Sequence, residues 1–152
     1  MSLAKLDRRP RHCVLGIGYE LMLAGAETDD GYELMRFLVP PGMSPPPHVH
    51  HYEDECFYLV NGQLVVQRGT KQISVSPGDS IHMPRGVPHT FRNESDGFAE
   101  FLCWVRPATL ESFFAAFMQD WPEDEDLPPA PTQEHLDAMM ASASEHHMEI
   151  LL

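Results

Sequence analysis

Two stretches near the middle of the chain decide its fold: GMSPPPHVHHYEDECFYLVNG at residues 42–62 and GDSIHMPRGVPHTFRN at residues 78–93. In and between them, short apolar-rich runs end at turn signals. Asn61-Gly62 is the strongest kind of short hairpin signal. Pro77-Gly78-Asp79 joins a proline of fixed φ to a glycine that tolerates positive φ. This punctuation predicts short β-strands joined by tight turns.

The same pattern continues outward along the chain. Strands are expected at residues 19–23, 32–39, 48–51, 55–60, 64–68, 72–75, 80–83, 89–92 and 99–105. Eight or more short strands at this spacing indicate an all-β sandwich or barrel. A chain of 152 residues fits one such domain with a short addition.

The pattern changes to a helical period after Pro107. We expect two short helices joined by an acidic, proline-rich linker at 121–131, with Thr109 and Thr132 as their N-caps. Their apolar stripes are Leu110, Phe113, Phe114 and Phe117 in the first and Leu136, Met139, Met140 and Ala143 in the second. Such stripes favour packing on the barrel or on a partner subunit over a lid. The chain is therefore divided into a tail at 1–12, a barrel at 13–106 and a helical extension at 107–152.

Three histidines and one glutamate form the candidate metal site. His48 and His50 are two residues apart on a predicted strand, so both imidazoles point to one face, about 7 Å apart along the strand. Glu55 begins the next strand, and His89 begins a later one after Pro88. Three imidazoles and a carboxylate suit one divalent transition ion, and the ligand types alone leave Zn, Fe, Mn, Co and Ni open.

The neighbouring polar residues are assigned lesser roles. By strand parity His51 and His82 point away from the site, and His146 and His147 are expected to be solvated near the end of the last helix. A turn carboxylate, from Glu53 or Asp54, could orient a ligand histidine. Asn93 is expected to hydrogen-bond nearby backbone. The aromatic and aliphatic residues expected to line the barrel interior are Phe57, Leu59, Phe91, Phe101 and Trp104.

The spacing of these ligands and of the glycines around them resembles the two sequence motifs of the cupin family at every position. In residues 42–62 it reads glycine, five residues, His48, one residue, His50, four residues, Glu55, six residues, glycine. In residues 78–93 it reads glycine, five residues, proline, one residue, glycine, two residues, His89, three residues, asparagine. The resemblance covers about a third of the chain. It implies a double-stranded β-helix, or jelly-roll, barrel with a metal at His48, His50, Glu55 and His89.

The resemblance also implies a function. The ligand set is similar to that of cupin dioxygenases, including bacterial single-domain quercetinases, whose metal is held by three histidines and one glutamate. We therefore expect an oxygenase that acts on a small aromatic or enolic compound, with Glu55 as ligand and proton acceptor. A metal-dependent isomerase, epimerase or lyase and a non-catalytic small-molecule binding or sensor module remain open, because the family hosts many chemistries.

Composition and charge narrow the partners. A net charge of −13 with only ten Lys and Arg argues against nucleic acid. No apolar run reaches the roughly 18 residues that a membrane span needs. Basic residues at 5–11 precede an apolar stretch at 14–24, but Glu20 interrupts it, so we expect no export signal and a cytoplasmic protein.

Two further expectations concern the cysteines and the oligomeric state. Cys13, Cys56 and Cys103 are odd in number and widely spaced, which predicts buried, reduced thiols. The apolar segment at 14–23 could add a strand to a neighbour's sheet, since open barrels carry edge strands that need cover. A homodimer is therefore expected.

Overall fold

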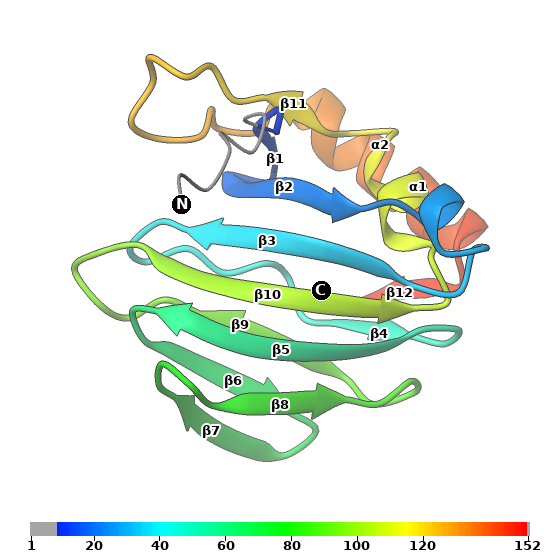
Figure 1. Ribbon diagram of the computed structural model, residues 1–152. Helices are drawn as coiled ribbons and strands as arrows, with labels where there is room; N and C mark the ends of the chain where they lie inside the picture. The colour runs from blue at the N-terminus through cyan, green and yellow to red at the C-terminus, as the bar shows by residue number, and fades with distance from the viewer. Residues whose placement is uncertain (1–8, 152) are drawn as a thin grey trace, which may run out of the picture.

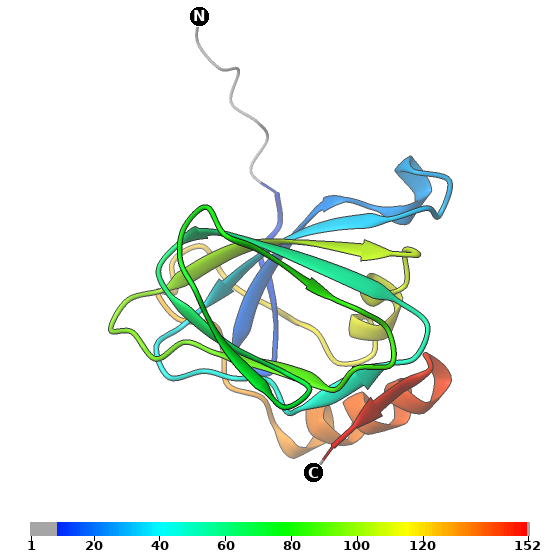
Figure 2. The same ribbon diagram turned by 90° about the horizontal axis from the view of Figure 1, so that it is seen from below.

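The computed structural model describes residues 9–151 and contains two antiparallel β-sheets that curve around a common interior (Figures 1 and 2). The larger sheet has the strand order β11-β1-β2-β3-β10-β5-β8, and the smaller has the order β12-β4-β9-β6-β7. The strands are β1 (His12–Val14), β2 (Ile17–Leu23), β3 (Glu33–Val39), β4 (His48–His50), β5 (Asp54–Asn61), β6 (Leu64–Arg68), β7 (Lys71–Val75), β8 (Ser80–Met83), β9 (His89–Arg92), β10 (Ala99–Arg106), β11 (Gln119–Asp120) and β12 (Met148–Ile150).

The path of the chain is that of a jelly roll. From β3 onward it crosses repeatedly between the sheets, because β3, β5, β8 and β10 belong to the larger one and β4, β6, β7 and β9 to the smaller one. This confirms the all-β prediction. The strands expected at 64–68, 80–83 and 89–92 have the predicted bounds, and the other expected strands begin or end within two residues of theirs.

The core lies between the sheets and follows the two-residue period of the strands. Along β3 every second residue is buried, and β10 shows the same alternation. Phe101 packs against Phe37 and Phe57, with ring centroids 5.1 and 4.6 Å apart. Trp104 corrects the sequence prediction: it points outward and is 38% exposed, because Cys103 and Val105 occupy the inward positions on either side of it.

The turn residues of the two motifs behave as expected. Gly62 has φ of +81°, and a Cβ there would lie 2.6 Å from the carbonyl oxygen of Phe98. Asn93 is fully buried, and its amide donates to the carbonyl oxygens of Val39 (2.8 Å) and Gly97 (2.7 Å). These contacts tie the β3 end to the β9–β10 loop.

The C-terminal extension contains two strands as well as two helices, α1 (Leu110–Phe114) and α2 (Gln133–Glu145). β11 pairs with β1 and β12 pairs with β4, so the extension adds a strand to each sheet. A single turn of 3₁₀ helix, η1 (Gly25–Glu27), connects β2 to β3. No helix in the described part of the chain is long and apolar enough to cross a membrane.

The helix caps differ in part from those predicted. Thr132 caps α2 as expected, by accepting a hydrogen bond from the His135 amide. Thr109 makes no such bond. Instead a carboxylate oxygen of Glu33 accepts from the amides of Leu110 (3.0 Å) and Glu111 (3.2 Å), because β3 brings this buried side chain beneath the start of α1.

Three other expectations need correction. The segment at 14–23 pairs inside its own chain, with β2 between β1 and β3, so it offers no strand to a neighbour. The homodimer stays a prediction, without this segment as support. Met140 is 41% exposed, while Met139 is buried. Cys56 is only half-buried, on the outer face of β5, whereas Cys13 and Cys103 are buried.

Candidate metal centre

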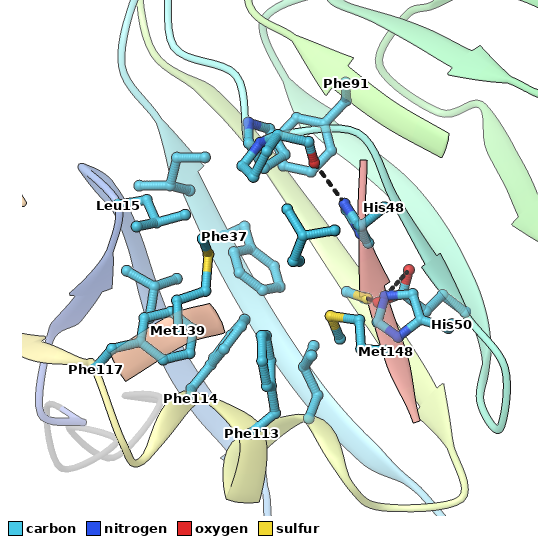
Figure 3. A pocket seen from close by; sticks show the side chains of 18 of the residues that line it. Leu15, Phe37, His48, His50, Phe91, Phe113, Phe114, Phe117, Met139 and Met148 are labelled. Carbon is cyan, nitrogen blue, oxygen red and sulfur yellow. Dashed lines mark hydrogen bonds and ion pairs between the residues drawn. The ribbon is translucent and has the colours of Figure 1, made fainter. Parts of the chain in front are cut away.

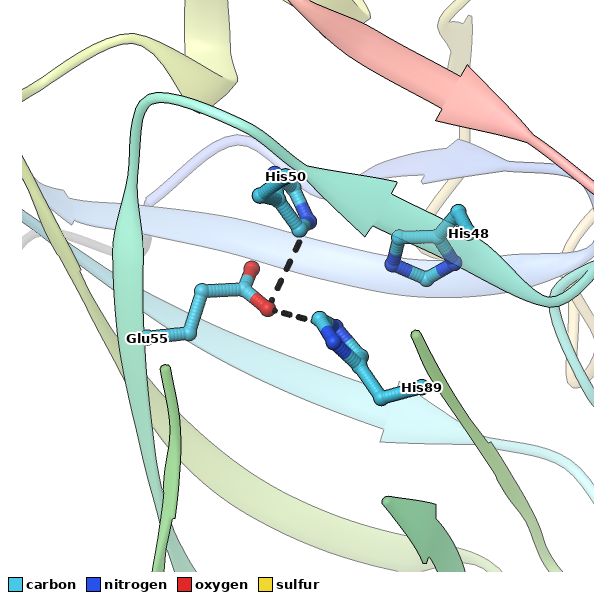
Figure 4. A group of neighbouring side chains, drawn as sticks. All are labelled: His48, His50, Glu55 and His89. Carbon is cyan, nitrogen blue, oxygen red and sulfur yellow. Dashed lines mark hydrogen bonds and ion pairs between the residues drawn. The ribbon is translucent and has the colours of Figure 1, made fainter. Parts of the chain in front are cut away.

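The four candidate ligands come from three strands and meet inside the barrel (Figure 4). β4 carries His48 and His50, β5 carries Glu55 and β9 carries His89. His48 lies directly opposite His89 in the β4–β9 pair. One ligand atom from each of the four side chains lies within 4.8 Å of the others. The structure thus brings together the set predicted from the sequence; that it binds a metal stays a prediction.

The carboxylate of Glu55 contacts two of the three histidines. Glu55 Oε2 lies 2.9 Å from His89 Nε2 and 3.5 Å from His50 Nε2. The ring centroid of His48 lies 4.5 Å from that of His89 and 5.0 Å from that of His50. Ligand atoms held about 2.0–2.2 Å from one ion lie at most about 4.4 Å apart, so the group needs only a small contraction to surround one.

The other nitrogen of each ring is already occupied. Nδ1 of His48 lies 2.8 Å from the Pro46 carbonyl oxygen, and Nδ1 of His89 lies 3.2 Å from that of Val87. Nδ1 of His50 lies 3.1 Å from Glu53 Oε2. Carbonyl and carboxylate oxygens only accept, so each Nδ1 carries the proton and donates it. Each Nε2 therefore faces the centre, and when it holds no second proton it offers its lone pair there, which is the form in which imidazole binds metals.

The charges of the group are set by burial and by its own members. Burial, together with the neighbouring His89 and His50, lowers the pKa of His48 to about 3, so this ring is neutral. Burial alone would raise the pKa of Glu55. The positive charge of a protonated His50, and the hydrogen bond that His89 donates when its Nε2 also holds a proton, outweigh burial and lower that pKa to about 2. Burial opposes protonation of His50, yet Glu55 and Glu53 raise its pKa overall. The buried carboxylate thus needs a positive charge beside it, which either a protonated histidine or a bound metal ion supplies.

Glu53 is the carboxylate that orients a candidate ligand, His50. It is 2% exposed, and its second oxygen accepts a hydrogen bond from the Thr109 hydroxyl. Asp54, the other candidate, instead accepts a hydrogen bond from the Arg85 guanidinium at the surface, at 2.8 Å. The two carboxylates therefore have different partners: Glu53 contacts the candidate metal centre and Asp54 does not.

The remaining histidines lie away from the centre. His51 and His82 are exposed as predicted and contact Glu149 and Asp54, respectively. His147 is exposed as well. His146 is half-buried rather than solvated, because Ser112 and Ser142 hydrogen-bond its ring at the α1–α2 contact.

A pocket opens beside the ligands and runs away from them between the sheets (Figure 3). Its volume, including the solvent at its mouth, is about 630 Å³. Phe37, Phe57, Phe91 and Phe101 supply part of the lining from the strands, which confirms that Phe57, Phe91 and Phe101 face the interior.

Much of the rest of the lining comes from the C-terminal extension, which sequence reasoning did not assign to a site. These residues are Leu110, Phe113, Phe114, Phe117, Met139, Met148 and Ile150. The only available signals were an apolar helical stripe, which is typical of any packed helix, and the alternation Met148-Glu149-Ile150, which is too short to distinguish.

Comparison with known proteins points to one family. Residues 35–105 match the family described as "Cupin domain". Quercetin 2,3-dioxygenase of Bacillus subtilis (strain 168) is 27% identical over 96 residues, which are 63% of this chain and 28% of that protein. The oxalate-binding protein of Thermotoga maritima is 30% identical over 70 residues, 46% of this chain and 58% of that protein. The chain spans less than two thirds of either relative.

A solved structure supports the fold. The crystal structure of a predicted oxalate decarboxylase from Thermotoga maritima superimposes with a TM-score of 0.62, covering 66% of this chain and 94% of that one. Sequence identity is 21%, so the likeness concerns the fold alone. The matched family and this neighbour agree with the jelly roll described above.

Proposed function

The chain carries a cupin domain, and from that premise we propose that it is a metal-dependent dioxygenase. Its single divalent transition ion would be held by His48, His50, Glu55 and His89, and its substrate would be a small aromatic or enolic compound. Cupins are typically metalloproteins, and quercetin 2,3-dioxygenase is among the similar sequences.

One observation carries the proposal: three Nε2 atoms and an ionised carboxylate converge at the end of an apolar pocket. Each imidazole is fixed by a hydrogen bond on its far side, so the donors are oriented before any ion arrives. Four protein ligands leave room on a five- or six-coordinate ion, whereas a closed structural zinc site uses all of its positions.

The residues of the chain have separate tasks in this proposal. The bound ion would supply Lewis acidity and, for Fe, Mn, Co or Ni, access to redox chemistry. Glu55 would accept the proton of an acidic enol or phenol. His50 would be kept in position by Glu53, and the phenylalanines lining the pocket would exclude water from the reacting carbons.

The apolar lining favours this proposal over an isomerase or epimerase of sugars. Sugar hydroxyls need polar partners, and of the described residues that line the pocket only the metal-site side chains and a thiol, that of Cys103, are polar. A lyase and a non-catalytic binding module remain as outcomes of the test.

The test combines metal analysis with oxygen uptake. Protein purified without an affinity tag should contain nearly one equivalent of Fe, Mn, Co or Ni and should consume dioxygen with some members of a panel of catechols, flavonols and cyclic enols. Turnover without oxygen would replace the proposal with an isomerase or lyase. Stoichiometric metal with ligand binding but no turnover would replace it with a binding module.

A further inference from the structure

The strand β12 lies directly beside the strand that carries two of the ligands. In the antiparallel β12–β4 pair, Met148 is opposite His50 and Ile150 is opposite His48. The amide of Leu151 donates to the Pro47 carbonyl at 2.8 Å, which extends the pairing beyond the strand end. Opposite residues in antiparallel strands point to the same face. Met148 and Ile150 therefore lie beside the imidazoles, on the side that faces the pocket, and Figure 3 shows Met148 next to His50.

Met148 and Ile150 begin one apolar wall of the pocket, which the C-terminal extension supplies. The helices of the extension form the more distant part of this wall. Phe113 and Phe114 of α1 stand along the pocket, and Met139 of α2 lies with Phe117 at the side away from His48 and His50 (Figure 3). Met139 is 5% exposed. The wall therefore runs continuously from the candidate metal ligands to α2.

Polar side chains are confined to one end of this pocket. Apart from His48, His50, Glu55 and the thiol of Cys103, the described lining residues are apolar, and none is Lys or Arg. A second charge or a set of hydroxyls on a ligand would be buried there without partners, which costs free energy. Methionine side chains are flexible and polarizable, and they adapt to flat or irregular apolar ligands.

We propose that the C-terminal segment 110–151 selects the substrate, and that this substrate has an elongated apolar body with a single oxygen-bearing end. Met148 and Ile150 contact the body near the ligands, and Met139 contacts its far end. Dicarboxylates, sugars and sugar phosphates are poor ligands. The role of the end group rests on the proposed metal centre, whereas the role of the wall does not.

A graded set of metal-binding probes tests the wall. Acetohydroxamic, benzohydroxamic and 2-naphthohydroxamic acids share one metal-binding end and differ in apolar size. Calorimetry on the Co²⁺-loaded protein should show affinity rising at least about tenfold from the first to the last. Met139→Gln and Met148→Gln keep the side-chain length but add an amide. Each should lose about fivefold or more in 2-naphthohydroxamate affinity while acetohydroxamate binds within about twofold of wild type.

Met140→Gln is the matched control, because Met140 neighbours Met139 on α2 but is 41% exposed; its affinities should equal those of wild type. Fluorescence titration of 2-naphthol into metal-free protein gives a readout without the ion. If no hydroxamate binds but 2-naphthol binds and weakens in the Gln variants, the metal centre fails and the wall stands. If wild type binds acetohydroxamate but gains no affinity from the larger apolar groups, the proposed role of the wall is wrong. Full retention of that gain in both Gln variants would overturn it too.

Discussion

The pocket has a polar end and an apolar end, and the two are held in place by different forces. At the polar end, Pro46, Val87 and Glu53 each accept a hydrogen bond from a ligand imidazole, so directional contacts fix the atoms. At the apolar end, Phe113, Met139 and their neighbours are held by close packing. Position matters to a fraction of an ångström at the first end, whereas shape and polarity matter at the second.

This difference suggests a division of labour. The polar end belongs to barrel strands and the far wall to the extension, so chemistry and selectivity can vary separately. Contacts between the barrel and the extension join the two ends near the candidate ligands: Thr109, just before α1, donates to Glu53, and β12 pairs with β4. Substitutions in the barrel and in the extension, on either side of these contacts, test whether a change at one end affects the other.

The largest effect is expected at the polar end itself. His50→Ala removes one ligand, and metal affinity should fall by more than the roughly 10–100-fold that loss of an outer hydrogen bond costs. Metal content after dialysis, measured by mass spectrometry, checks this. His51→Ala is the control, since its side chain is adjacent in sequence but exposed. Equal metal loss in both variants would contradict the ligand assignment.

The next effect concerns Glu33, which connects β3 to the start of α1. Burial, together with the charges of Glu111 and Glu53, raises the pKa of its carboxyl to about 7 despite the hydrogen bonds it accepts. A raised folded-state pKa stabilises the protein below the unfolded value of 4.5, and this contribution is lost as pH rises through 7.

Between pH 4.5 and pH 8, the free energy of unfolding of wild type should therefore fall by up to about 3 kcal/mol relative to that of Glu33→Gln. Urea denaturation of both proteins across this range provides the measurement. Parallel pH profiles for wild type and variant would show that Glu33 is not the group responsible.

A smaller effect is expected where the two ends touch. Glu53→Gln keeps the size of the side chain but removes its charge and so weakens the hydrogen bond from His50. Metal affinity should fall about 10–100-fold, with little change in the melting temperature. Competition with a chelator measures the affinity. Asp54→Asn is the comparison variant, because its carboxylate pairs with Arg85 at the surface; if it lowers affinity as much as Glu53→Gln, Glu53 has no special role.

The smallest effect is expected at the apolar end alone. Thr132→Ala removes the N-cap of α2 and should cost about 1 kcal/mol of unfolding free energy. Metal affinity should remain that of wild type, since α2 does not contact the ligands through hydrogen bonds in the described residues. A matching drop in metal affinity, seen in the same chelator competition, would show that the two ends are coupled.

The polar end was predictable from the sequence because a set of candidate metal ligands is restricted in both residue type and spacing. His48 and His50 must be two apart to share a strand face, and His89 must follow the turn at Gly86. The jelly roll was predictable for a related reason: turns need glycine or proline, and strands between them keep a period of two.

The apolar wall was not predictable, because many arrangements bury the same residues. Met139 and Met140 are the same residue type and belong to the same predicted apolar stripe. Only the packing of α2 on the barrel buries one and exposes the other. Likewise, Glu33 caps α1 across a large sequence separation, which no local pattern encodes. Trp104 was assigned inward because aromatic residues are usually core, yet its strand parity places it outside.

The most direct test is a crystal structure of protein prepared without an affinity tag, with diffraction recorded on both sides of the absorption edges of Mn, Fe, Co, Ni and Zn. We expect one anomalous peak for a single element, about 2.0–2.2 Å from Nε2 of His48, His50 and His89 and from a carboxylate oxygen of Glu55. No peak at this position after soaking in each metal, or a peak bound to other residues, would contradict the proposed centre.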